Sequence, residues 1–324
     1  MNKFLLDSMI KISLAALASL SLVALAQDFP SKPVRIIVPW PPSGNVDITA
    51  RTIAPALSDA LGQQVIVENR AGAGGTIGTA AVAKSAPDGY TLALGSSGTI
   101  TNAPAVYKTI SYDPIRDFTA IGPIQSVPIV LTAAPKTPVT TYKEFVELSR
   151  ARPVSIASAG NGSSNHLAIE LLMRQAGLKL THIPYKGSGP AITDLLGSQV
   201  DSMMDQLTAS IGHIKEGRLK ALAVTSRARS PLLPNVPTLA ELGVANFEAS
   251  TWTGLFGPAG MPPAVVEKLN AALRKAMAVE TVRERYRSMG VELMDLSQPE
   301  FTAYVRADYD KWRALARDAK ISIE

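Results

Sequence analysis

Small and hydroxylated residues follow the predicted strands of this sequence, and residues of this type suit the binding of an anion. They occupy five loops, at 39–47, 69–76, 95–99, 158–166 and 185–189. Glycine lets backbone N–H groups approach a ligand, and each loop leads into a predicted helix whose first N–H groups and dipole favour negative charge. A single loop of this kind is explained as a tight turn or a helix cap. Five of them at one sheet edge predict a site for a carboxylate.

Some side chains near these loops could contact a ligand directly. Trp40 lies beside the first loop and could stack on a planar substrate or pack as a lid. The pair Asp205-Gln206 follows the predicted strand 200–204 and could accept a hydrogen bond from a ligand or help to close a cleft. Asp47 and Arg51 stand one helical turn apart, so we expect them to pair with each other rather than to act as catalysts.

The known nucleotide and metal motifs are not matched. The glycine-rich segment 72–78 resembles a dinucleotide-binding fingerprint, which requires an acidic residue at the end of the next strand. Here that strand ends in Leu94, Gly95 and Ser96, so nucleotide binding is not predicted. The sequence also has no Gly-Lys-Ser/Thr phosphate loop and no G-x-S-x-G elbow. The histidines lack metal-ligand spacing, and we predict neither a metal nor a cofactor. They are His166, His182 and His213.

One enzyme alternative remains open at this stage. Ser163 or Ser164 could act as a nucleophile with His166 as its base, which would make the chain a secreted serine hydrolase. His166, however, begins a predicted helix, where a capping or ligand-facing role is favoured. The sequence therefore predicts a binding protein that is not an enzyme, with no catalytic residue.

The charge pattern does not favour nucleic acid as a partner. The chain has 32 basic and 27 acidic residues, a formal net charge of +5, and its basic residues are scattered rather than clustered. A nucleic-acid interface requires a basic patch or a recognised motif. The sequence has no cysteine, so neither disulfides nor the lipid anchor of a bacterial lipoprotein is expected.

The first 26 residues read as a signal peptide. Lys3 and Lys11 precede an uncharged run, 12–26, that ends in Ala24-Leu25-Ala26, a small-x-small cleavage pattern. The run is about 15 residues long, whereas a membrane-spanning helix requires about 20. We expect cleavage after Ala26 and a periplasmic location for the mature protein. Loss of Lys3, Lys11 and Asp7 would lower the net charge to +4.

Beyond the leader, apolar runs alternate with helical patterns, which is typical of α/β proteins with parallel sheets. Helices are expected where apolar residues recur at a helical spacing, as at Ile53, Leu57 and Leu61 before Gly62. The predicted helices lie at 47–61, 76–84, 165–176, from Pro262 through the apolar stripe to Met277, and at 299–319. The predicted strands lie at 34–38, 64–68, 90–94, 154–157, 180–184, 200–204, 221–225 and 250–257.

The order of these elements predicts two α/β lobes joined by two crossings. Prolines mark the first crossing, and the segment 250–257 forms the return. The expected division is 27–125 for the first part of lobe 1, 126–249 for lobe 2, and 250–324 for the return crossing and C-terminal helices that pack on lobe 1.

Several motifs, in one order, are similar to those of a known family. The segments 39–51, 67–75, 87–91 and 182–187, with the C-terminal helix around Trp312, resemble the receptors of tripartite tricarboxylate transporters, the Bug-type extracytoplasmic solute receptors. The resemblance covers essentially the whole mature chain. It implies a type II periplasmic-binding-protein fold with two crossing strands as a hinge, like a Venus flytrap. It also implies a small carboxylate ligand (a di- or tricarboxylate, an amino acid or an aromatic carboxylate) and a permease of two membrane subunits as partner.

The resemblance and the loops together define the candidate ligand-binding residues. They are Trp40, Ser43, Gly44, Asn45, Ala73, Gly74, Gly75, Ser96, Ser97, Thr99, Gly160, Asn161, Ser163, Ser164, His166, Lys186, Gly187 and Asp205. One departure bears on the ligand: many members have Gly-Gly where this chain has Ser43-Gly44, and Asn45 is an unusual residue after that pair. The ligand identity is therefore not carried over, and a sensory role is as compatible with the motifs as uptake.

Overall fold

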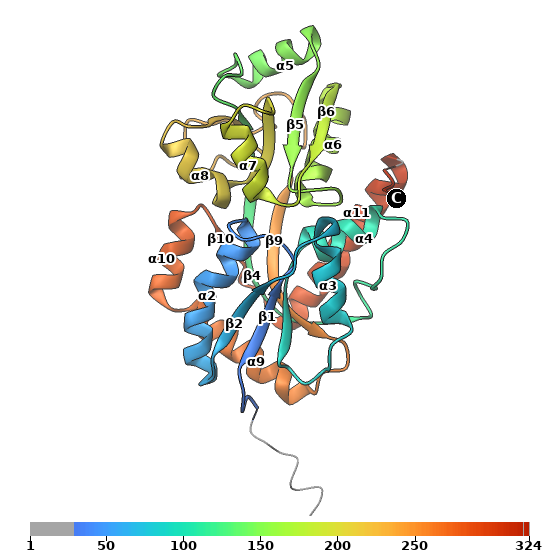
Figure 1. Cartoon of the computed structure of the whole chain (residues 1–324), viewed down its shortest axis with the longest axis vertical. Coiled ribbons are helices and arrows are strands. Elements are labelled where there is room, and N and C mark those ends of the chain that lie inside the picture. The colour runs from blue at the N-terminus through green and yellow to red at the C-terminus, as the bar shows by residue number, and fades with distance from the viewer. Residues whose placement is uncertain (1–28, 320, 324) are drawn as a thin grey trace, which may run out of the picture.

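The computed structural model describes residues 29–319 and 321–323, so the predicted signal peptide lies outside the described residues. The described chain forms two α/β lobes stacked along the long axis of the molecule, with two strands running from one lobe into the other (Figure 1). We call the lobe that contains the first strands lobe 1 and the other lobe 2. No helix in this part of the chain combines the length and apolar character that crossing a membrane requires.

Lobe 1 is built on parallel strands. β1 (Val34–Val38) lies between β2 (Val65–Asn69) and β3 (Thr91–Ser96), and is parallel to both. β9 (Ser250–Pro258) adds to β3 in the antiparallel direction. The inner strands β1 and β3 are mostly buried, as expected for a parallel sheet covered on both faces, whereas the edge strand β2 is only partly buried.

Lobe 2 repeats this arrangement with different residues. β5 (Val154–Ser158) lies between β6 (Leu180–Pro184) and β7 (Ser202–Gln206), and is parallel to both. β7 pairs with the crossing strand in the antiparallel direction, and β8 (Lys220–Val224) pairs with the other edge of that strand. The carboxyl ends of the parallel strands in both lobes face the space between them (Figure 1), and ligands bind at such ends.

The crossing strand β4 (Phe118–Ala133) belongs to both sheets. Its residues from Phe118 to Pro128 pair with β9, and those from Ile129 to Ala133 pair with β7. The partner changes at Pro128, which has no N–H to donate to a ladder. β10 (Glu292–Leu293) pairs with β4 on the lobe 1 side.

The helices follow the strands in the expected order. Their bounds are α2 Asn45–Leu61, η1 Ala73–Gly75, α3 Thr76–Ala83, η2 Gly98–Asn102, α4 Ala103–Val106, α5 Tyr142–Ala151, α6 Ser164–Ala176, α7 Ser188–Leu196, α8 Leu207–Lys215, α9 Pro263–Met277, α10 Glu280–Ser288 and α11 Gln298–Ala319. The helices α9, α10 and α11 lie with lobe 1 (Figure 1). α11 contacts η2, α4 and β4, which matches the expectation that the C-terminal helices pack on that lobe.

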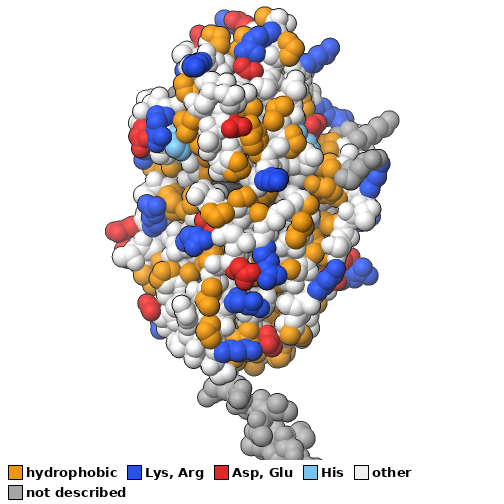
Figure 2. All heavy atoms as spheres, viewed as in Figure 1, with side chains coloured by type: hydrophobic (Ala, Val, Ile, Leu, Met, Phe, Trp, Pro, Cys, Tyr) orange, Lys and Arg blue, Asp and Glu red, His pale blue; other side chains and the backbone are white. Residues whose placement is uncertain are grey.

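Each lobe has its own core. One large cluster of buried side chains joins α2 and α9 to the sheet of lobe 1, and another fills lobe 2 around Phe145 and Phe247. A smaller cluster joins the lobes, because Leu167 of α6 packs with Val106 of α4 and Trp312 of α11. On the face shown in Figure 2, basic and acidic side chains are interspersed rather than segregated.

Most predicted elements are confirmed to within two residues. The strands 34–38 and 180–184 have the predicted bounds, and Gly62 ends α2 in the left-handed conformation. The two crossing strands that the resemblance implied are present, but the local patterns did not mark β4 as one continuous strand and did not predict α5, α7, α8 and α10.

Candidate ligand-binding site

A small cavity lies between the two lobes. Its lining residues are Trp40, Pro41, Gly44, Asn45, Val46, Ser96, Gly98, Ala159, Ser163, Ser164, Asn165, Ser188, Gln206 and Thr251. Both lobes contribute, and none of these lining residues carries a charged side chain. The cavity volume is about 20 Å³, which is the space of about one water molecule. The lobes are therefore closed on each other in this structure.

Three helices begin at this cavity. The first residues of α2, α6 and α7 are Asn45, Ser164 and Ser188, and all three line it. The first N–H groups of a helix have no partner within the helix, and the helix dipole places partial positive charge at that end. Three such ends around one uncharged cavity form a site that favours a negatively charged group.

The loop before α6 is held by its own side chains. The hydroxyl of Ser163 accepts a hydrogen bond from the N–H of His166 at 3.2 Å and donates to the carbonyl of Gly160 at 2.6 Å. Ser163 is thus the N-cap of α6, and it fixes the turn that brings the helix to the cavity.

Two glycines let the lobes approach closely. A Cβ atom added to Gly74 of lobe 1 would lie 2.3 Å from the carbonyl oxygen of Asn161 in lobe 2. A Cβ atom added to Gly187 would lie 2.7 Å from Cδ of Pro41. Both glycines also have positive φ values, of 63° and 146°, that residues with a side chain rarely adopt. Glycine at these positions is therefore required for the closed arrangement.

Hydrogen bonds also join the lobes. The hydroxyl oxygens of Ser97 and Ser164 lie 2.8 Å apart, and the Tyr107 hydroxyl donates to the carbonyl of Asn161 at 3.1 Å. Gln206 of lobe 2 donates from Nε2 to the Thr251 hydroxyl at 3.1 Å. These contacts hold the closed arrangement through neutral groups, which exchange readily with water when the lobes separate.

Two hydrogen-bond donors in the cavity wall have no protein partner. The indole Nε1 of Trp40 and the amide Nδ2 of Asn45 are buried without an acceptor among the described residues. Most buried polar groups in proteins are satisfied. Unpaired donors at a cavity between two lobes therefore indicate a site for acceptor atoms.

Asp205 lies behind the cavity wall. Its carboxylate is fully buried and accepts hydrogen bonds from Ser188 at 2.6 Å, Ser210 at 2.8 Å and Asn165 at 3.3 Å. Burial raises the pKa of Asp205 to about 6, although these hydrogen bonds lower it. The side chain holds Ser188 and Asn165 in place at the cavity and is not itself part of the lining.

Asp47 and Arg51 pair as expected, with Arg51 Nε 2.9 Å from Asp47 Oδ1. Burial alone would raise the pKa of Asp47, but hydrogen bonds from Arg51, from the backbone of Ser43 and from Asn69 outweigh it and lower the pKa. Asp47 is therefore a charged residue that fixes the loop before α2.

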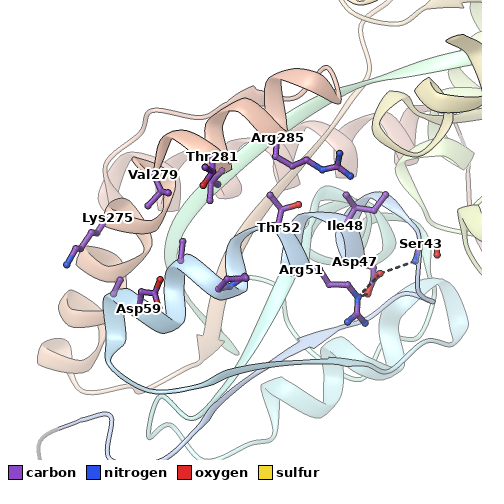
Figure 3. A pocket seen from close by; sticks show the side chains of 14 residues that line it. Ser43, Asp47, Ile48, Arg51, Thr52, Asp59, Lys275, Val279, Thr281 and Arg285 are labelled. Atoms are coloured by element: carbon purple, nitrogen blue, oxygen red, sulfur yellow. Dashed lines mark hydrogen bonds and ion pairs between the residues drawn. The ribbon is translucent and has the colours of Figure 1, made fainter.

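A larger groove, of about 820 Å³, lies outside the cleft on lobe 1, between α2 and the helices α9 and α10 (Figure 3). Ser43, Asp47 and Arg51 line one end of it, and Lys275 and Arg285 lie on the opposite wall. This groove is open, belongs to one lobe and is lined by charges of both signs. The closed cavity between the lobes is the better candidate for a ligand site.

The stacked histidines support the loops of lobe 2. The rings of His166 and His182 lie 4.4 Å apart, and desolvation lowers the pKa of His182 to about 4. His166 Nδ1 accepts a hydrogen bond from the N–H of Gly162 at 3.2 Å, and its Nε2 lies 3.5 Å from Glu170. The structure gives no support to the hydrolase alternative, because the Ser163 and Ser164 hydroxyls bond to Gly160 and Ser97.

The structure brings part of the predicted set to the cavity. The predicted residues that line it are Trp40, Gly44, Asn45, Ser96, Ser163 and Ser164. Others lie in the contact between the lobes or in the loops behind the wall: Gly74, Gly75, Ser97, Thr99, Gly160, Asn161, His166, Gly187 and Asp205. Ser43, Ala73 and Lys186 are exposed.

Other lining residues were not among the predicted ones. They are Pro41, Val46, Gly98, Ala159, Asn165, Ser188, Gln206 and Thr251. Six of these eight lie in the five predicted loops, so the loop signal could have found them. Gln206 comes from the end of β7, where the sequence indicated a ligand contact for the pair Asp205-Gln206, and the structure places Gln206 rather than Asp205 in the lining. Thr251 comes from the start of β9, where only the pairing of the strands brings it to the cavity.

Comparisons with known proteins agree with this geometry. The family profile described as "Tripartite tricarboxylate transporter family receptor" matches residues 49–321. The protein BugT of Bordetella pertussis is 37% identical over 321 residues, covering 98% of this chain and 98% of BugT.

Solved structures give the same result. The periplasmic binding protein BugD has a TM-score of 0.88 and 38% identity, covering 91% of this chain and 100% of that chain. The structure of Rpa4515 of R. palustris with adipate has a TM-score of 0.87 and 34% identity, and the match covers 91% of this chain and 99% of that chain. MatC from Rhodopseudomonas palustris with bound malate has a TM-score of 0.85 and 34% identity, and the match covers 88% of this chain and 99% of that chain.

Proposed function

Because this chain belongs to the tripartite tricarboxylate transporter receptor family, a family of periplasmic solute-binding receptors, we propose that it captures a small carboxylate between its lobes and delivers it to a membrane permease. The observation that carries this proposal is the meeting of three helix N-termini at one uncharged cavity between the lobes. Relatives support it, since one structure of 34% identity holds adipate and another holds malate.

The absence of charged side chains from the lining fits reversible capture. A buried ion pair has a large desolvation cost, whereas helix N-termini offer fixed donors that need no counter-charge. A dissociation constant in the micromolar range corresponds to about −8 kcal/mol, which suffices for scavenging. The lining offers donors for a carboxylate, and none of its residues is a histidine, aspartate or glutamate that could act as a base.

Ligand entry requires the lobes to separate, because the cavity in this structure holds about 20 Å³. The crossings in β4 and β9 are the points where the lobes can move apart, since β4 changes its pairing partner between Pro128 and Ile129. Closure would then exclude water and strengthen the hydrogen bonds to the carboxylate. The closed form would be the form that docks on the two-subunit permease.

The same proposal assigns 27–125 and 250–324 to lobe 1 and 126–249 to lobe 2. It places the mature protein in the periplasm after cleavage behind Ala26. A receptor that signals to a membrane sensor would use the same closure, and deletion of the permease separates the two roles. Uptake of the ligand by cells should stop in that strain if the protein serves transport.

Calorimetric titration of the mature protein tests the proposal. Aliphatic and aromatic mono-, di- and tricarboxylates form the panel, and neutral sugars serve as the comparison. We expect at least one carboxylate to bind in the micromolar range and the sugars not to bind. Binding of sugars without binding of any carboxylate would refute the proposal.

A further inference from the structure

The side chain of Asn45 has an orientation that its neighbours dictate. The Thr49 hydroxyl donates to the carbonyl of Asn45 at 2.8 Å, so its oxygen must accept from Gln125. The atom of Gln125 that faces Thr49 is therefore the amide Nε2, which also lies 3.0 Å from the side-chain oxygen of Asn45. Because a donor faces Asn45 on that side, Oδ1 of Asn45 points to Gln125 and Nδ2 is left for the cavity.

Nδ2 of Asn45 is buried and has no acceptor among the described residues. Nε1 of Trp40 is a second buried donor without an acceptor in the same wall. An indole N–H can only donate, and leaving a buried donor unpaired is unfavourable. The lobe 1 wall thus presents two side-chain donors in addition to the backbone N–H groups at the start of α2.

The cavity lining has no carboxylate that could pair with a cationic group on a ligand. None of the residues that line the cavity carries a carboxylate, and Asp205 behind the wall already accepts from Ser188 and Ser210. A ligand ammonium would bring more donors, and a positive charge, to a lining that has no carboxylate to pair with it. A hydroxyl, carbonyl or carboxylate oxygen of a ligand would accept hydrogen bonds from the unpaired donors of Trp40 and Asn45.

We propose that Asn45 determines the ligand specificity of this receptor by donating from Nδ2 to a second acceptor group on the ligand. The preferred ligands are then dicarboxylates and hydroxycarboxylates, ahead of monocarboxylates and ahead of amino acids. Gln125 is a positioning residue that holds the amide of Asn45 in the donor orientation. This inference rests on the proposed function, and it goes further by assigning the choice among carboxylates to one side chain.

The test compares four ligands of four carbons by calorimetry: butanoate, succinate, malate and aspartate. The wild-type protein should bind succinate or malate at least about tenfold more tightly than butanoate, and malate more tightly than aspartate. In Asn45→Ala the preference over butanoate should shrink to within about threefold. Asn102→Ala is the matched control, because Asn102 also has a buried, unpartnered Nδ2 but does not line the cavity. It should keep the wild-type preferences.

Asn45→Asp gives a second test that does not depend on the alanine variant. It keeps the shape and the oxygen that faces Gln125, but it replaces the donor by a carboxylate oxygen. The ratio of malate to aspartate affinity should therefore fall by at least about tenfold, because the ammonium of aspartate now meets an acceptor. A merely structural role for Asn45 would weaken all four ligands equally.

The outcomes separate this inference from the proposed function. If none of the carboxylates binds the wild-type protein, the proposed function itself fails. If carboxylates bind but Asn45→Ala and Asn45→Asp keep the wild-type order of ligands, the receptor function stands and the role of Asn45 is refuted.

Discussion

Ser97 and Ser164 join the two lobes at the cleft through their hydroxyl groups, whose oxygens lie 2.8 Å apart. Ser97 follows β3 of lobe 1, and Ser164 is the first residue of α6 in lobe 2. The pair can form only when the lobes are closed. Its strength therefore adds to the stability of the closed form and, through closure, to ligand affinity.

Ser97→Ala and Ser164→Ala should each weaken ligand binding by about 1 kcal/mol, or about fivefold in affinity, because each removes the same neutral hydrogen bond. The double variant should lose little more than either single variant. Calorimetric titration with the best carboxylate of the panel measures this. Ser149→Ala is the control, since Ser149 bonds only within α5. Additive losses in the double variant would show that the two hydroxyls act independently.

Gly74→Ala should block closure and weaken binding at least about tenfold, because the new Cβ atom would lie 2.3 Å from the carbonyl of Asn161. The positive φ of Gly74 adds strain, so Gly177→Ala is the matched control: its φ is 64° against 63°, and open space surrounds it. Both variants should lose about 1 kcal/mol of stability. Equal ligand affinity in the two variants would remove the Gly74 loop from the closing surface.

Ligand binding should change the tryptophan fluorescence through Trp40. The chain has three tryptophans, and Trp252 and Trp312 both donate to the carboxylate of Asp308 and do not line the cavity. Trp40 lines the cavity with a free indole N–H. A fluorescence titration should show a spectral shift that disappears in Trp40→Phe. Persistence of the full shift in that variant would assign the signal to the other two tryptophans.

Asp205 should make the protein less stable as pH rises. Burial raises its pKa from 3.8 to about 6, so the folded protein favours the protonated form. The stability that this form contributes is complete below pH 4 and is lost as pH rises through about 6. The difference between the two pKa values corresponds to about 3 kcal/mol. Denaturant unfolding between pH 4 and 7 should show Asp205→Asn gaining stability relative to the wild type by an amount of this order.

The control for this prediction is Asp201, whose pKa shifts in the opposite direction. Burial alone would raise it, but hydrogen bonds from Arg152 and Ser155 lower it. Asp201 therefore contributes stability above its unfolded pKa that is lost in acid. Asp201→Asn should lose stability relative to the wild type as pH rises, opposite in sign to Asp205→Asn. Parallel slopes for the two variants would contradict the assignment.

The fold was predictable where a local pattern decides the structure. The segment Val34–Val38, buried except at Arg35, reads as a strand, and Ile53, Leu57 and Leu61 mark the buried face of α2. The long strand β4 was not predictable in the same way. Its prolines suggest breaks, yet Pro123 lies beside an irregularity in the ladder and Pro128 lies where the partner changes, so both are tolerated.

The site was predictable to the level of its loops. The order of the strands indicates which loops meet at the cleft. The glycine and serine residues in those loops mark them as binding loops, because these residues let backbone groups approach a ligand. Tertiary contacts decide how the side chains at the cavity are oriented. Gln125 in β4 donates a hydrogen bond to the side-chain oxygen of Asn45, and Asp205 accepts one from the Ser188 hydroxyl. Neither pair is close in sequence. No local sequence pattern therefore distinguishes the residues that line the cavity from the residues behind the cavity wall, such as Asp205.

The strand β9 comes after lobe 2 in the chain but completes the sheet of lobe 1, where its residues pair with β3 at Gly95 and Gly254. Contacts between residues so distant in sequence slow folding, because the intervening chain must be ordered or looped out first. The strands β5 to β8 of lobe 2 all lie between β4 and β9 in the chain, so their contacts span shorter separations in sequence. We therefore expect lobe 2 to acquire hydrogen-exchange protection before lobe 1 during refolding. The side of the cleft that carries Asn45 would then form last.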